Sequence, residues 1–226
     1  MTFSLTARCG DTGMLGIVIS SSSPDVAARC VHVRADVGAV ASQNITDPRL
    51  GQIGLDLLAK GLSASETCDA LVASSRFIAY RQLAIVDAAG RTASHSGSNT
   101  LGIHAVATCE GAIAAGNLLA NDQVPAAMIA AYRASSGSPF AERLLAALKA
   151  GLDQGGEAGP VHSAGLYVVR EVAWPIVDLR VDWSDHPIAT LEEVWAVYKP
   201  QVEAYVQRAR QPSEAPGFGV AGERRP

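Results

Sequence analysis

The sequence predicts an α+β fold in which two antiparallel sheets stack face to face and helix pairs cover their outer faces, a four-layer αββα sandwich. Segments with the two-residue alternation of half-buried strands occur in hairpin pairs. Helical segments come in adjacent pairs between those hairpins, which argues against a doubly wound parallel sheet. Alanine, glycine and valine abound while aromatics make up 5% of the 226 residues. Such small residues suit closely stacked sheets.

The elements follow one another in a regular order. In chain order we expect strands at 2–8 and 15–19, two strands within 31–43, helices at 47–61 and from 63, strands at 83–87, 91–96, 103–108 and 112–119, helices at 122–134 and 140–151, strands at 165–170 and 176–182, and a last helix from 190.

Capping residues carry the helix assignments. Asp47 is a good N-cap before Pro48, and Gly61 suits the left-handed residue that ends a helix. The spacing Ser63-x-x-Glu66 is a capping box, as is Thr190 with the glutamate three residues on. The last helix keeps its apolar face across residue 200, a proline, so we expect a kink there.

The chain organisation predicted from composition is one domain over residues 1–209 and a tail over 210–226. The net charge is −4 and the sequence pI about 5.7, with no basic patch. Nucleic acid is therefore not an expected partner. No apolar run reaches the roughly 20 residues of a membrane span, and we expect no leader before the first strand. We expect a soluble cytoplasmic protein.

Metal and cofactor chemistry has no sequence support. The four cysteines (Cys9, Cys30, Cys68 and Cys109) are widely spaced, and no C-x-x-C pair or H-E-x-x-H spacing occurs. We expect the cysteines to be small buried residues, and we expect neither a metal nor a cofactor.

The tail has little to bury, and composition alone predicts disorder. Ordering it costs roughly 1–2 kcal/mol per residue in backbone entropy. An ordered tail therefore needs a partner surface, and Phe218 and Val220 are its sizeable apolar groups. We expect it to pack on a second subunit of a homodimer, with Phe218 as anchor and the Arg224-Arg225 pair against acidic surface. A crystal contact is the alternative.

Thr2 is the residue with the sharpest chemical meaning. If Met1 is removed, Thr2 begins the chain on a rigid strand, with its hydroxyl as nucleophile and its own α-amine as base. An α-amine has a pKa of about 7.7–8.0, so part of it is unprotonated near neutrality. A chain that begins Met-Thr on a strand is also common without any catalytic meaning. If Met1 is kept, the nitrogen of Thr2 is an amide and cannot act as a base.

Other polar residues are candidates for the same or a neighbouring site. Asn117 follows Gly116 at a strand end, where its side chain suits an oxyanion donor or a tight turn. Gln43 ends another strand. Arg180 lies between Asp178 and Asp182 on one strand face, as a binding group or as a paired surface charge.

His162 precedes Ser163, but neighbouring residues on a strand point to opposite faces, so a catalytic dyad is not expected. We expect a half-exposed Thr2 near Asn117, in a polar cleft at one end of the sheets.

Short strings spread along the chain resemble a known family. In order they are Thr2-Phe3-Ser4, Gly38-Ala39-Val40-Ala41-Ser42-Gln43, Asp47-Pro48-Arg49-Leu50-Gly51, Gly116-Asn117-Leu118-Leu119, His162-Ser163-Ala164 and Asp178-Leu179-Arg180-Val181-Asp182. The chain resembles the bacterial family catalogued as domain of unknown function 1028 over most of its length. The resemblance implies a fold like that of the N-terminal-nucleophile (Ntn) hydrolases and supplies no substrate.

One loop departs from that family. In the family this loop has a sequence similar to Gly-Gly-Asp-Arg-Arg-Gly-Arg-Gln-Ser-Ala. This chain has Gly155-Gly156-Glu157-Ala158-Gly159-Pro160-Val161-His162-Ser163-Ala164 there. Three basic residues are missing, and His162 replaces a glutamine. If those arginines bind an anionic substrate, this chain binds a different substrate or none.

Two kinds of function remain open. The chain is a hydrolase that cleaves an amide or related C–N bond of a small molecule, with Thr2 as nucleophile and Asn117 as oxyanion donor. Alternatively, it is a non-catalytic protein on the same scaffold, which binds a small polar ligand or serves assembly. The loss or retention of Met1 separates them.

Overall fold

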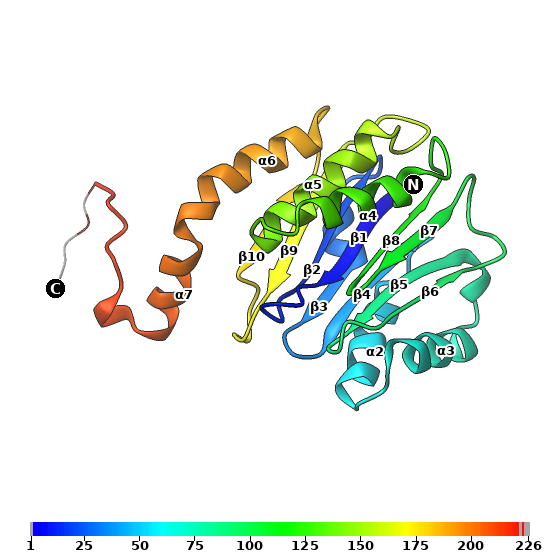
Figure 1. Ribbon diagram of the computed structural model, residues 1–226, viewed down its shortest axis with the longest axis horizontal. Helices are drawn as coiled ribbons and strands as arrows, with labels where there is room; N and C mark the ends of the chain where they lie inside the picture. The colour runs from blue at the N-terminus through cyan, green and yellow to red at the C-terminus, as the bar shows by residue number, and fades with distance from the viewer. Residues whose placement is uncertain (1, 222, 224–226) are drawn as a thin grey trace.

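The computed structural model of this chain describes residues 2–221 and 223, and it has the predicted four layers (Figure 1). The strands are β1 (Thr2–Arg8), β2 (Leu15–Ser21), β3 (Val31–Arg34), β4 (Gly38–Asn44), β5 (Arg81–Asp87), β6 (Thr92–Ser96), β7 (Ala105–Cys109), β8 (Ala112–Asn117), β9 (Ser163–Val169) and β10 (Val177–Val181). The helices are α1 (Val26–Cys30), α2 (Pro48–Ala59), α3 (Ala64–Ser74), α4 (Val124–Ala134), α5 (Phe140–Asp153), α6 (Pro187–Tyr198) and α7 (Val202–Arg210).

Two antiparallel sheets form the middle layers. The large sheet has the order β10-β9-β2-β1-β8-β7, and the small sheet has the order β3-β4-β5-β6. Helices α4 and α5 lie over the outer face of the large sheet, and α2 and α3 lie over that of the small sheet (Figure 1). The first strand of the chain is therefore an interior strand with a neighbour on each side.

The two-residue alternation of β1 decides which side chains meet which layer. Phe3 and Leu5 are fully buried against the α4–α5 side. The opposite face of the large sheet meets the small sheet, and the core there combines Ile17 and Ile19 with small residues such as Ala41 and Ala84. Small side chains at these positions let the two sheets approach closely.

The predicted caps of the first helix pair are confirmed. The Asp47 side chain accepts the N–H of Arg49 at the start of α2, and Ser63 and Glu66 form both bonds of the capping box on α3. Gly61, just beyond α2, has φ = 95°, which glycine adopts without strain.

Two helix assignments differ from the prediction. The short helix α1 was not predicted, because its five residues are too few for a periodic pattern. The predicted capping box at Thr190 is wrong, because α6 begins at Pro187 with His186 as N-cap. The Thr190 hydroxyl instead donates to the carbonyl of His186 within the first turn.

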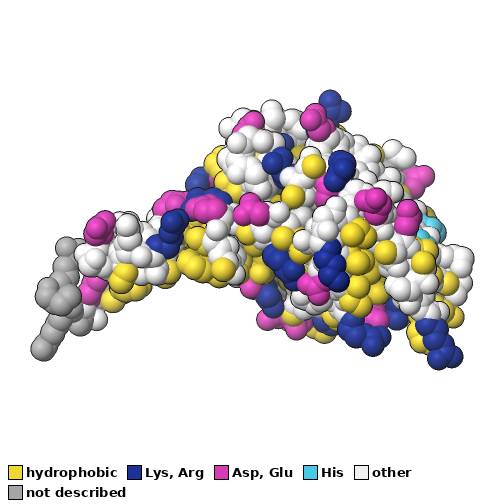
Figure 2. Space-filling view, turned by 90° about the horizontal axis from the view of Figure 1, so that it is seen from below, with side chains coloured by type: hydrophobic (Ala, Val, Ile, Leu, Met, Phe, Trp, Pro, Cys, Tyr) yellow, Lys and Arg dark blue, Asp and Glu magenta, His cyan; other side chains and the backbone are white. Residues whose placement is uncertain are grey.

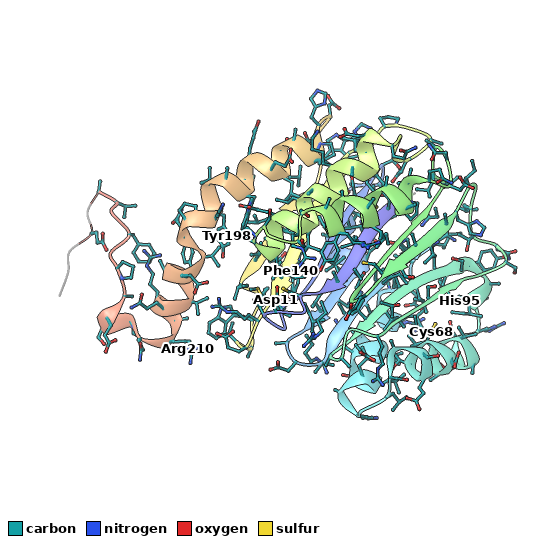
Figure 3. The ribbon with its side chains drawn as sticks, in the orientation of Figure 1. Asp11, Cys68, His95, Phe140, Tyr198 and Arg210 are labelled. Carbon is teal, nitrogen blue, oxygen red and sulfur yellow. The ribbon has the colours of Figure 1, made fainter. Side chains whose placement is uncertain are left out.

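The chain ends in an arm that projects from the sandwich (Figure 1). The predicted kink is present as a 3-10 turn at Lys199–Gln201 between α6 and α7. Figure 3 shows Tyr198 at the end of α6, and its hydroxyl donates to the carbonyl of Ile176, 3.1 Å away.

Aromatic contacts order the tail against its own helix. The ring centroids of Tyr205 and Phe218 lie 6.5 Å apart, and the Arg208 guanidinium lies 3.8 Å from the Phe218 ring centroid. Phe218 is still 57% exposed, and Figure 2 shows apolar side chains along the arm. Its packing on a second subunit stays a prediction, as does the domain boundary after residue 209. The Arg224-Arg225 pair lies outside the described residues.

Close packing of α1 on the large sheet gives the first test. A Cβ added at Gly165 of β9 would overlap the Cβ of Ala27 on α1, which cannot rotate away. We expect Gly165→Ala to lower the free energy of unfolding by about 1–3 kcal/mol through overpacking. Denaturant unfolding of both proteins measures it.

Gly137→Ala is the matched control, because nothing lies within 4 Å of a Cβ added there. Its free energy of unfolding should change by less than about 0.5 kcal/mol. Equal effects of the two substitutions would contradict the close packing of α1.

Candidate functional site

Thr2 and Asn117 lie side by side, as predicted. In the antiparallel ladder between β1 and β8, Thr2 pairs directly with Asn117. Directly opposed residues point to the same face of a sheet, which here is the face toward the small sheet. Thr2 is 4% exposed and Asn117 fully buried, so the expectation of a half-exposed Thr2 is wrong.

A chain of buried amide and hydroxyl groups links the two sheets at this end. Ser4 Oγ donates to Gln43 Oε1 at 2.9 Å, and Gln43 Nε2 donates to Gln82 Oε1 at 2.9 Å. Asn117 Nδ2 donates to the same Gln82 oxygen at 3.0 Å. Gln82 Nε2 in turn donates to the carbonyl of Gly116 and to Ser96 Oγ. These groups form one network across the gap between the sheets.

Asn117 keeps hydrogen-bonding capacity beyond this network. Its Oδ1 is buried and has no hydrogen-bond partner among the described residues. Only one of the two Nδ2 protons is used by Gln82. The next residue, Leu118, has φ = 51°, a left-handed conformation that costs a bulky residue roughly 1–3 kcal/mol. Such strain is held by its surroundings, here by the bond from the N–H of Ala158 to the Leu118 carbonyl.

Glu157 is the residue that sequence reasoning missed. It forms an isolated antiparallel bridge with Leu119, two positions beyond Asn117. Both its carboxylate oxygens accept the N–H of Ser22, at 3.1 and 3.2 Å, one position beyond β2. Strands β2 and β8 flank β1, so the Glu157 side chain lies between their continuations, just past the Thr2 end of β1.

The environment of Glu157 disfavours its charge. Glu157 is 4% exposed. Burial raises the pKa of Glu157 to about 7, and the hydrogen bonds from Ser22 work in the opposite direction. A carboxyl with such a pKa exchanges its proton near neutrality. In the sequence, its one signal was an acidic residue at the position of the family's aspartate.

His162 lies near this end but is held by another loop. Its ring stacks on Trp183 with centroids 4.4 Å apart, and its Nδ1 lies 3.3 Å from the Ser184 carbonyl oxygen. The N–H of His162 donates to the carbonyl of Ser21. The backbone of His162 thus extends the sheet next to the site, while its ring is positioned by residues 183–185.

Asp178 and Arg180 lie away from Thr2. They form a two-pronged ion pair on the edge strand β10, with N–O distances of 2.7 and 3.0 Å. Strands β9 and β2 separate β10 from β1. The structure therefore does not bring this pair to the Thr2–Asn117 rung.

Within residues 2–221 and 223, no group of three or more His, Cys, Asp or Glu side chains is placed to hold a metal ion. No helix in that part of the chain is long and apolar enough to cross a membrane.

The amide network should contribute to stability. Gln82→Met keeps the length of the side chain but leaves Gln43 Nε2 and Asn117 Nδ2 without an acceptor. We expect the free energy of unfolding to fall by roughly 2–5 kcal/mol, because buried unsatisfied donors are costly. Ser74→Ala is the control, because its hydroxyl bonds only its own helix, at Ala70 and Leu71. A loss no larger than that of the control would contradict the network.

The raised pKa of Glu157 makes stability depend on pH. The folded chain holds this proton more tightly than the unfolded chain, whose carboxyl has an ordinary pKa near 4.5. The stabilisation by this proton is complete below about pH 4 and is lost as pH rises through about 7. It amounts to roughly 3–4 kcal/mol at about 1.4 kcal/mol per pKa unit.

Denaturant unfolding from pH 5 to pH 8 measures this dependence. We expect Glu157→Gln to flatten the decline in the free energy of unfolding, and Glu193→Gln, at an exposed position on α6, to leave it unchanged. Identical pH profiles for all three proteins would contradict the raised pKa.

Comparisons with known proteins support the resemblance found in the sequence. The family model described as "Family of unknown function (DUF1028)" matches residues 2–191. A crystal structure of a protein from Silicibacter pomeroyi assigned to that family is 32% identical, with a TM-score of 0.83. The match covers 93% of this chain and 94% of that chain.

A more distant match is Anbu, an ancestral β-subunit, from Yersinia bercovieri. It is 11% identical with a TM-score of 0.40, over 96% of this chain and 100% of that chain. The sequence has no significant match among curated proteins. With the family model matching residues 2–191, more than half of the sequence, this chain belongs to the DUF1028 family.

Proposed function

We propose that this chain is an N-terminal-nucleophile hydrolase that cleaves an amide or related C–N bond of a small cytoplasmic molecule. Thr2 is the nucleophile once Met1 has been removed. The observation that carries the proposal is the rung on which Thr2 pairs with Asn117. It puts a hydroxyl and an amide side chain on one face, at the end of an interior strand. A rigid strand holds both groups in a fixed relation, as catalysis requires.

The chemistry needs only groups of Thr2 for proton transfer. The α-amine takes the proton of the Thr2 hydroxyl as Oγ attacks the substrate carbonyl. The resulting ammonium gives that proton to the leaving nitrogen as the C–N bond breaks. Water then hydrolyses the Thr2 ester, with the same amine as base, and returns the enzyme to its starting state.

Asn117 is the proposed oxyanion donor. Its second Nδ2 proton is not used by Gln82, and one donor of this kind is worth about 2.7–4 kcal/mol of transition-state stabilisation in a well-studied hydrolase. The strained Leu118 fits the proposal, because backbone strain clusters at active sites.

A second candidate is a non-catalytic small-ligand-binding or structural protein on the same scaffold. The observation that favours it is the buried network, in which Gln43 donates to Gln82 and these two residues bond Ser4 and the Gly116 carbonyl of the other sheet. Such a network stabilises the fold whether or not the protein catalyses a reaction. The mass of the protein from its native cells separates the two candidates, because retained Met1 leaves no free amine on Thr2.

Covalent labelling tests the hydrolase without knowledge of the substrate. The chain is produced so that it begins at Thr2, by cleavage of an N-terminal fusion, and is treated with a β-lactone. We expect one acyl adduct on the N-terminal peptide, read by mass spectrometry. Thr2→Ser should keep the adduct, and Thr2→Ala should lose it, a fall of at least about 100-fold in labelling rate.

Thr6→Ala is the control on the same strand and the same face, and it should label like the unchanged chain. The chain that retains Met1 should not label. Absence of an adduct on the chain that begins at Thr2, or equal labelling of Thr2→Ala, would contradict the proposed nucleophile.

A further inference from the structure

We propose that Glu157 is the positioning residue for the α-amine of Thr2: its carboxylate binds that amine and aims the nitrogen lone pair at the Thr2 hydroxyl. This inference rests on the proposed function, and it assigns a role to a residue outside the Thr2–Asn117 rung.

The pairing of the strands locates the carboxylate. Phe3 pairs with Ser20 on one side of β1, and Thr2 pairs with Asn117 on the other. The position one rung beyond Thr2 therefore lies opposite Ser22, whose N–H donates to both carboxylate oxygens of Glu157. That rung is the place toward which the backbone nitrogen of Thr2 points.

The backbone of the loop that carries Glu157 is fixed against the segment that follows β8. The N–H of Ala120 donates to the Gly156 carbonyl at 3.0 Å, and the N–H of Ala158 donates to the Leu118 carbonyl at 2.9 Å. A Cβ added at Gly156 would lie 3.4 Å from the ring of Phe3, so the loop also touches β1. Glu157 thus has a defined position at the end of β1.

The Ser22 bonds do not use up the carboxylate. The Ser22 N–H serves both oxygens and the Ser22 side chain also bonds the carboxylate, while an ionised carboxylate has about four acceptor sites. An amine held by one of these sites keeps its lone pair free for the hydroxyl proton. When the amine takes that proton, the carboxylate stabilises the new ammonium, as the aspartate of a Ser-His-Asp triad stabilises its imidazolium.

Among the described residues, the charge of His162 and the hydrogen bonds from Ser22 favour the ionised form of Glu157, while burial opposes it and raises the pKa of Glu157. A carboxylate next to the amine favours the ammonium, so it raises the pKa of the amine; an opposite charge within about 4–6 Å shifts a pKa by roughly 1–3 units.

The test measures the amine directly, on the chain that begins at Thr2. The rate of acetylation of the α-amine by acetic anhydride is followed against pH, with the N-terminal peptide quantified by mass spectrometry. We expect the amine pKa to be lower by about one unit or more in Glu157→Gln. Glu157→Asp, which keeps the charge on a shorter side chain, should restore part of the shift.

Two features keep the outcome interpretable. In Glu157→Gln the side-chain amide oxygen still accepts the Ser22 N–H, so the loop is expected to remain folded. Asp122→Asn removes an exposed carboxylate near the end of β8 and is the matched control. An amine pKa that is the same in Glu157→Gln and in the unchanged chain would overturn the inference, whatever the stability of the variant.

The β-lactone reaction is then measured on the same proteins. We expect it to slow by at least about tenfold in Glu157→Gln and its pH midpoint to move down with the amine. If the amine pKa shifts but no protein is labelled, the proposed hydrolase fails while the contact between Glu157 and the amine stands. If labelling persists and the amine pKa does not shift, Thr2 is supported as the nucleophile and the role of Glu157 is ruled out.

Discussion

The buried amide network between the sheets is the interaction on which this end of the molecule depends. Gln82 lies at its centre, accepting from Gln43 and Asn117 and donating to the Gly116 carbonyl. In a low-dielectric interior each such bond is strong, and each missing partner is costly. The network therefore fixes how β4 and β5 sit against β1 and β8, and with them where Thr2 and Asn117 lie.

The rest of the interior between the two sheets is built differently. There the sheets meet through Ile17, Ile19 and alanines, which pack without directional demands. Apolar packing supplies burial, while hydrogen bonds at the Thr2 end supply a unique alignment. The protein thus separates the part of its core that drives folding from the part that positions polar chemistry.

Most of the fold could be predicted because its signals are local. Alternation along β1 and the caps at Asp47 and Ser63 are written in a few neighbouring residues, and the structure bears them out. The start of α6 was misplaced because a capping-box pattern at Thr190 also fits an interior turn. The proximity of Thr2 and Asn117 could be predicted, since both were expected at strand ends.

The role of Glu157 could not be predicted, because its position depends on a loop that contacts two strands far away in the sequence. No local pattern encodes the contact with Ser22, 135 positions earlier, or the burial that raises its pKa. Asp178 and Arg180 are the opposite case, because their conspicuous charge pattern forms an ion pair on an edge strand, away from the rung of Thr2 and Asn117.

The interior position of β1 has a consequence for how the protein is made. Its partner β2 is synthesised almost at once, but β8 ends at Asn117, half the chain later. At roughly 5–20 residues per second on the ribosome, the first strand waits on the order of ten seconds for its second neighbour. During that interval the start of the chain is still open to the enzymes that trim nascent proteins. The order of the sheet therefore sets an interval in which the start of β1 is accessible, and pairing with β8 ends it, because Thr2 is 4% exposed in the folded chain.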